Sequence, residues 1–144
     1  MYTQTPPDYV VTSISKNLHQ LVASIAGNLL QTSVKRDSFI VNEITPEFQI
    51  ATDEKILATV LNSLLSSIVN HTKQSCIRVK ASAYEDIIFV SVREAGIFNT
   101  AAITGDLEHV KLLANKINGN VTMQIMENKF TDIQLSFPNF PRAT

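Results

Sequence analysis

The 144-residue chain contains no tryptophan, one cysteine, four glycines and five prolines. A single cysteine excludes an internal disulfide framework and fits a reducing compartment. The formal charge is −1 and no basic run is present, so the sequence lacks the basic patch that is typical of nucleic-acid binding. No apolar run approaches the roughly 20 residues that a membrane span requires. We therefore expect no nucleic-acid partner and no membrane span.

The chain has the length of one ordinary domain. Its composition, 44% hydrophobic and 17% charged, is typical of a globular protein. The first residues have neither the basic nor the apolar region of a signal peptide, so the cytoplasm is the expected location. We predict an extended N-terminal arm at 1–12, one domain at 13–138 and a C-terminal tail at 139–144.

Apolar residues recur with helical spacing in three segments. They predict helices near residues 13–34, 53–71 and 104–118. The second of these helices is expected to start at Thr52 or Asp53, which are both favourable N-caps. Each helix carries one apolar stripe, which must be buried against another element.

Alternating apolar residues predict the strands. Two hairpins are expected at 75–92 and 121–137, the second turning at Glu127-Asn-Lys, and shorter strands are expected at 39–44 and 49–51. Residues 93–103 are predicted as a loop. The economical arrangement is an α/β fold of two layers (an α+β sandwich), with a mixed sheet and about three helices packed on one face.

Several segments resemble the catalytic domain of the histidine-kinase ATPase family. The acidic cap at Asp53, the Leu64-Leu-Ser run and the closing Thr72 are similar to that family's nucleotide-binding helix. Val90-Ser-Val-Arg-Glu-Ala-Gly-Ile resembles its Val-x-Val-x-Asp-Asn-Gly-Ile motif, and Thr131-Asp-Ile-Gln-Leu-Ser-Phe-Pro resembles its Thr-x-Phe-x-Phe-x-Leu-Pro end. The resemblance covers about residues 13–138 and implies a Bergerat-type ATPase fold.

The resemblance also implies which residues would surround a nucleotide. Ser67 stands where the family has its magnesium-binding asparagine, and Ser63 replaces another asparagine one turn earlier. Glu94 stands where an aspartate accepts a hydrogen bond from adenine, followed by the matching Gly96. The implied pocket positions are Ser63, Ser67, Glu94, Gly96, Phe98 and Gly105.

Four departures from the family pattern argue against nucleotide binding. Ser67 lacks the carboxamide, Phe98 replaces a glycine that permits close approach, and Asp106 places a negative charge where phosphate would dock. Only eight residues separate Gly96 from Gly105, so the family's long lid is missing. If each fault costs about 1–3 kcal/mol, the sum is comparable with the roughly 8 kcal/mol of a micromolar site.

The same positions have ordinary structural interpretations. Ser63 and Ser67 are small residues that allow close helix packing, Glu94 is a charged residue at a strand end, and Phe98 fills a core. The three histidines, His19, His71 and His109, do not cluster in the sequence, so no metal site is expected.

From this resemblance we predict a degenerate histidine-kinase-like ATPase domain that acts as a non-catalytic signalling or protein-interaction module in a two-component-type pathway. No catalytic residue, metal ion or cofactor is expected. The expected partner is a signalling protein or response regulator, with a homodimer as a further option. Two alternatives stay open. One is an active sensor histidine kinase domain that takes Mg-ATP in an atypical pocket, and the other is a stand-alone anti-sigma-like serine kinase or phosphotransfer partner.

Overall fold

The computed structural model describes residues 16–126 and 130–139. The predicted arm at 1–12, residues 140–144 of the predicted tail and the Glu127-Asn-Lys turn lie outside the described residues. In chain order the elements are β1 (Lys16–Asn17), α2 (Leu18–Asn28), α3 (Leu30–Lys35), β2 (Phe39–Asn42), β3 (Gln49–Ile50), α4 (Glu54–Asn70), β4 (Thr72–Lys73), β5 (Cys76–Tyr84), β6 (Ile87–Glu94), β7 (Ile97–Phe98), α5 (Thr100–Ala114), the 3-10 turn η1 (Asn115–Ile117), β8 (Asn120–Met126) and β9 (Phe130–Pro138).

Five strands form one mixed sheet in the order β2-β5-β6-β9-β8. Strand β2 runs parallel to β5, and the other neighbours are antiparallel. Glu85, in the turn between β5 and β6, has a φ of 56°, which is the left-handed conformation common in tight turns. The prediction of one mixed sheet is confirmed. The short strand predicted at 49–51 is β3, which pairs with β1 outside this sheet.

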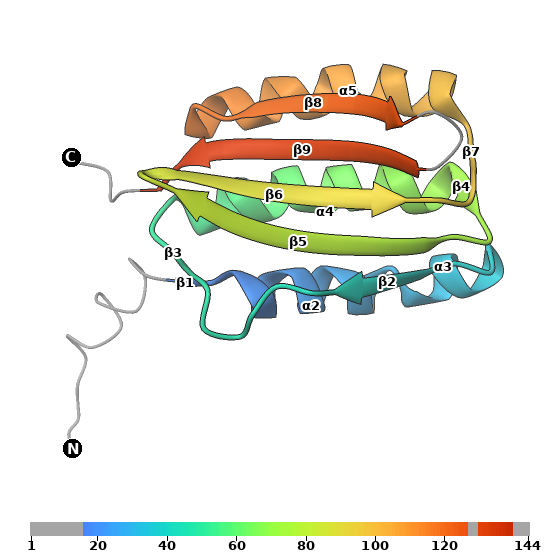
Figure 1. Cartoon of the computed structure of the whole chain (residues 1–144), viewed down its shortest axis with the longest axis horizontal. Coiled ribbons are helices and arrows are strands. Elements are labelled where there is room, and N and C mark those ends of the chain that lie inside the picture. Colours follow the sequence, from blue (N-terminus) through green and yellow to red (C-terminus); the bar gives the residue numbers. More distant parts are fainter. Residues whose placement is uncertain (1–15, 127–129, 140–144) are drawn as a thin grey trace.

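The helices lie together on one face of the sheet, behind it in the view of Figure 1. The core therefore lies between the two layers. Buried and exposed side chains alternate along the strands. On β5, Ile77 and Val79 are buried, whereas the residues that follow each of them, Arg78 and Lys80, are exposed. This arrangement confirms the predicted two-layer fold. In the part of the chain that the structure describes, no helix is long and apolar enough to cross a membrane.

The first predicted helix, at 13–34, is two helices in the structure. Helix α2 begins only after Asn17, whose side chain accepts a hydrogen bond from the backbone N–H of Gln20 at 3.0 Å. The helical path is interrupted at Leu29, where φ is −96° and ψ is 3°. The apolar stripe continues through this break, so periodicity alone did not reveal it.

Candidate functional site

Helix α4 supplies the residues at the centre of the predicted pocket. It begins as predicted, because the Asp53 carboxylate accepts hydrogen bonds from the N–H groups of Lys55 and Ile56 at 3.0 and 3.2 Å. Its wide apolar stripe is buried against the sheet. Ser67 is only 6% exposed, and Ser63 is half-buried. The buried stripe therefore fixes both serines beside α5.

Ser67 forms a direct contact between α4 and α5. Its hydroxyl donates a hydrogen bond to Oδ2 of Asp106 at 2.7 Å. The Nε2 atom of His71 lies 3.1 Å from the same oxygen. One carboxylate oxygen of α5 thus contacts two side chains at the end of α4, and these contacts hold the two helices together at this point.

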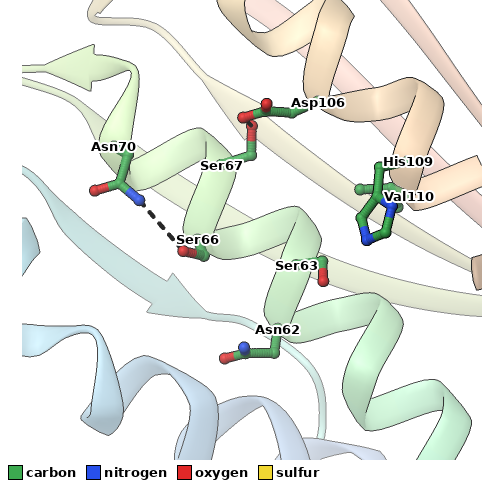
Figure 2. Close-up of a pocket in the computed structure, with 8 residues that line it drawn as sticks. All are labelled: Asn62, Ser63, Ser66, Ser67, Asn70, Asp106, His109 and Val110. Atoms are coloured by element: carbon green, nitrogen blue, oxygen red, sulfur yellow. Dashed lines mark hydrogen bonds between the residues drawn. The ribbon is translucent and has the colours of Figure 1, made fainter.

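A polar groove runs beside this contact. It has a volume of about 350 Å³ and is open to solvent. Figure 2 shows Ser67 and Asp106 pointing toward each other across it. Its lining residues are Asn62, Ser63, Ser66, Ser67, Asn70, Asp106, His109 and Val110. Of the five predicted positions whose side chains the structure describes, Ser63 and Ser67 line the groove, whereas Glu94, Gly96 and Gly105 do not.

Helix α5 begins four residues earlier than predicted. It starts at Thr100, because the Asn99 side chain accepts a hydrogen bond from the N–H of Ala102 at 3.1 Å. The segment predicted as a loop at 93–103 thus contains the end of β6, β7 and the first turn of α5. Gly105 and Asp106 consequently lie in the second turn of the helix.

This earlier start changes what the end of α5 offers to a ligand. Only the first four N–H groups of a helix lack a partner inside it, and an anion binds at these groups. In α5 they belong to residues 99–102, of which Asn99 already donates to the His71 carbonyl oxygen and Ala102 to the Asn99 side chain. The N–H groups of Gly105 and Asp106 lie too deep in the helix to bind phosphate.

Glu94 occupies a separate buried site at the end of β6. It is 3% exposed, and its Oε1 accepts hydrogen bonds from the Thr72 hydroxyl at 2.8 Å and the Gly96 N–H at 2.6 Å. The protein itself therefore supplies two donors to the carboxylate oxygen. His71, which contacts Asp106, directly precedes Thr72, which contacts Glu94. The two polar contacts are therefore linked through adjacent residues of the chain.

Gly96 has a packing role. A Cβ atom at this position would collide with the backbone carbonyl oxygen of Lys73 and would lie 2.6 Å from the Cβ of Ser75. The glycine is thus required where the chain crosses β4, whether or not a ligand binds. Gly105 is different, because a Cβ there would meet nothing within 4 Å.

Phe98 was predicted to fill the pocket. Its backbone pairs with Thr72 in the β4–β7 ladder, but its side chain lies outside the described part of the structure. The prediction for this side chain stays a prediction.

Sequence reasoning missed the contact of His71 with Asp106, because the two residues are 35 positions apart. His71 lies beside Asp106 and His109 lines the same groove. Across residues 16–126 and 130–139, no three His, Cys, Asp or Glu side chains are placed to hold a metal ion. For the Ser67–Asp106 contact a signal was available, because the resemblance implies that both residues border the phosphate side of one pocket.

Comparison with solved structures identifies the fold. The catalytic domain of histidine kinase ThkA superposes with a TM-score of 0.73 at 16% identity, covering 89% of this chain and 97% of that one. The histidine kinase AdeS of Acinetobacter baumannii gives 0.74 at 8% identity, with 92% and 71% covered. Full-length ShkA in complex with AMPPNP gives 0.74 at 17% identity, with 90% of this chain and 31% of ShkA covered.

No protein-family model matches the sequence, and no curated protein matches it either. The similarity is therefore structural. At such low sequence identities it supports a shared fold but not a shared chemistry. Its span, about nine-tenths of the chain, agrees with the resemblance seen in the sequence. The chain has the histidine-kinase-like ATPase fold of histidine kinase catalytic domains.

Proposed function

We propose that this chain is a histidine-kinase-type ATPase domain that has lost the family's nucleotide chemistry and acts as a non-catalytic protein-interaction module in two-component-type signalling. The observation that carries the proposal is the hydrogen bond of 2.7 Å between the Ser67 hydroxyl and the Asp106 carboxylate. The proposed partner is a signalling protein such as a response regulator, in the cytoplasm.

The residues present do not fit magnesium-bound phosphates. Magnesium requires hard oxygen ligands in near-octahedral geometry, whereas the Ser67 hydroxyl is engaged as a donor to Asp106. The phosphates would approach this carboxylate, and like charges repel. The nearby helix offers them no free N–H groups at Gly105 or Asp106, because both residues lie inside α5.

The adenine side of the pocket is also occupied. Oε1 of Glu94 already accepts two hydrogen bonds from the protein. An adenine amino group bound to Oε1 would have to share or displace them, and removing a partner from a buried polar group costs about 1–3 kcal/mol. On both the phosphate side and the adenine side, polar groups that could bind a nucleotide form hydrogen bonds within the protein instead. These hydrogen bonds support the proposed loss of nucleotide binding.

One observation favours a second candidate. Asp106 is a carboxylate with a side chain 48% exposed, and it faces the position of the family's magnesium ligand. In an active kinase domain with an atypical pocket, Asp106 would replace the missing asparagine as the metal-binding group. This candidate requires that Asp106→Ala, which removes the oxygen ligands, weakens Mg-ATP binding.

Titration calorimetry with Mg-ATP separates the two candidates. For the wild-type protein we expect no saturable heat up to about 1 mM nucleotide, and a melting-temperature shift below about 1 °C. A ligand present at its Kd adds about 0.4 kcal/mol of stability, which is about 1.4 °C for a domain of this size.

Two variants complete the experiment. Ser67→Asn alone should not restore binding, because the Asp106 carboxylate remains and the N–H groups of Gly105 and Asp106 lie inside α5. Asp106→Ala should leave the wild-type result unchanged, since no metal-binding role is lost and the other departures from the family pattern remain. Saturable wild-type binding at tens of micromolar that disappears in Asp106→Ala would refute the proposal and support the active kinase domain.

A further inference from the structure

Helices α4 and α5 present a continuous outer face on the side away from the sheet. They are antiparallel, because Ser67 near the end of α4 contacts Asp106 near the start of α5. At the other end a second cavity of about 150 Å³ is lined by Lys55, Ile56, Thr59, Leu113 and Lys116. The two cavities share no lining residue and lie toward opposite ends of the α4–α5 pair.

The face carries one exposed apolar side chain, Leu112, with small polar side chains on the neighbouring helix. Leu112 is 67% exposed, and by helical periodicity it points opposite to the buried Leu107 and Val110. The side chains of Thr59, Asn62 and Ser63 on the neighbouring helix are short. Short side chains allow another helical layer to approach closely.

Charge is distributed unequally between the two ends of the face. Lys55 and Lys116 lie at one end, and neither forms an ion pair with another described residue. Asp106 lies at the other end. Leu112 stands between them in sequence, four residues before Lys116 and six after Asp106.

We propose that a second copy of this chain covers this face, with a two-fold axis that passes near Leu112 and runs across the helices within the interface. This axis reverses the helix direction, so the lysine end of one copy lies over the Asp106 end of the other. It also places the two Leu112 side chains together at the centre. An axis along the helices would instead bring the lysine ends together, and charge repulsion disfavours it.

The size of the face predicts a weak dimer. A helix of 17 residues is about 26 Å long, and two helices about 9 Å apart cover a width of about 18–20 Å. The contact is therefore about 500 Å² per copy, or about 1,000 Å² in total, the lower limit for a specific interface. The inference rests on the proposed function, because the second copy would cover the Ser67 groove where an active domain would hold its nucleotide.

Analytical ultracentrifugation of the full chain tests this dimer. We expect a reversible monomer–dimer equilibrium with Kd in the micromolar range, measured from about 5 µM to about 1 mM protein. Leu112→Asp places two like charges on the axis and should raise Kd at least about tenfold. Leu112 is exposed, so the variant should fold, and thermal denaturation checks this.

Charge exchange tests the direction of the axis. Lys116→Glu and Asp106→Lys should each weaken self-association at least about threefold, because each creates two like-charge contacts per dimer. A mixture of the two variants should form a heterodimer at near wild-type affinity, since both of its contacts join opposite charges. A variant that failed to fold would not regain affinity in the mixture, so this recovery would exclude misfolding as the cause of the weaker self-association.

Two variants on α3 serve as controls. Leu30→Asp and Lys35→Glu make the same chemical changes at exposed positions of another helix, and both should leave Kd within about twofold of wild type. A chain that is monomeric at about 1 mM, or a dimer that survives Leu112→Asp, would overturn the proposal. A mixture that associates no better than its two components would also overturn it.

Discussion

Replacing Thr72 with valine should reveal how tightly the protein holds its own Glu94 carboxylate. The substitution keeps the shape of the side chain and removes the hydroxyl that donates to Oε1 at 2.8 Å. Thr72 is fully buried and Glu94 is 3% exposed, so water does not readily replace the lost donor. Gly96 N–H, at 2.6 Å, would be left as the donor that the structure shows on this oxygen.

The expected cost follows from this geometry. A hydrogen bond to a charged group contributes about 1.5–3 kcal/mol net, so we expect Thr72→Val to lower the free energy of unfolding by about 2 kcal/mol. An unfolding entropy of about 2.1 cal/mol/K per residue gives about 0.3 kcal/mol/K for this chain. The melting temperature should therefore fall by about 6–7 °C.

Urea denaturation of a double-mutant cycle with Glu94→Gln measures the coupling. We expect an interaction energy of about 1–2 kcal/mol between the two positions. Thr122→Val on β8 is the matched control, because Thr122 is exposed and its hydroxyl lies in water. If Thr72→Val costs less than about 0.5 kcal/mol, no more than a typical surface substitution, then Glu94 is not held by Thr72. Its oxygen would then be available to a ligand.

Three further substitutions test the local reasoning, each by thermal and urea denaturation. Gly105→Ala should stabilise the protein by about 0.5–1 kcal/mol, because the site is helical and a Cβ meets nothing within 4 Å; destabilisation would mean that Gly105 is not an ordinary helical residue. Gly96→Ala should destabilise by about 1–3 kcal/mol, because its Cβ would collide with backbone at Lys73, and a neutral result would contradict the packing role. Asp53→Ala should cost about 1 kcal/mol, because two N–H groups at the start of α4 lose their acceptor; Asp53→Asn should recover most of this loss, and equal losses in both would argue against capping.

The sequence by itself determined the two-layer arrangement of the fold and the start of helix α4. A single apolar stripe on each helix and alternation on each strand can be satisfied by one buried interface, and this predicted the two-layer arrangement that the structure has. The cap at Asp53 was also predictable, because the N–H groups that donate to its carboxylate lie only two and three residues further along the chain. Such patterns depend on neighbours along the chain.

Only the tertiary structure decided how the polar residues of the site are paired. The Ser67–Asp106 contact spans 39 residues and the Thr72–Glu94 contact spans 22, and no periodicity encodes either pairing. The register of β4 against β7 explains Gly96. The start of α5 depended on Asn99, a cap that the expected loop concealed. Satisfying buried polar groups is a condition on the whole packed chain, and it is therefore settled only when the helices and the sheet come together.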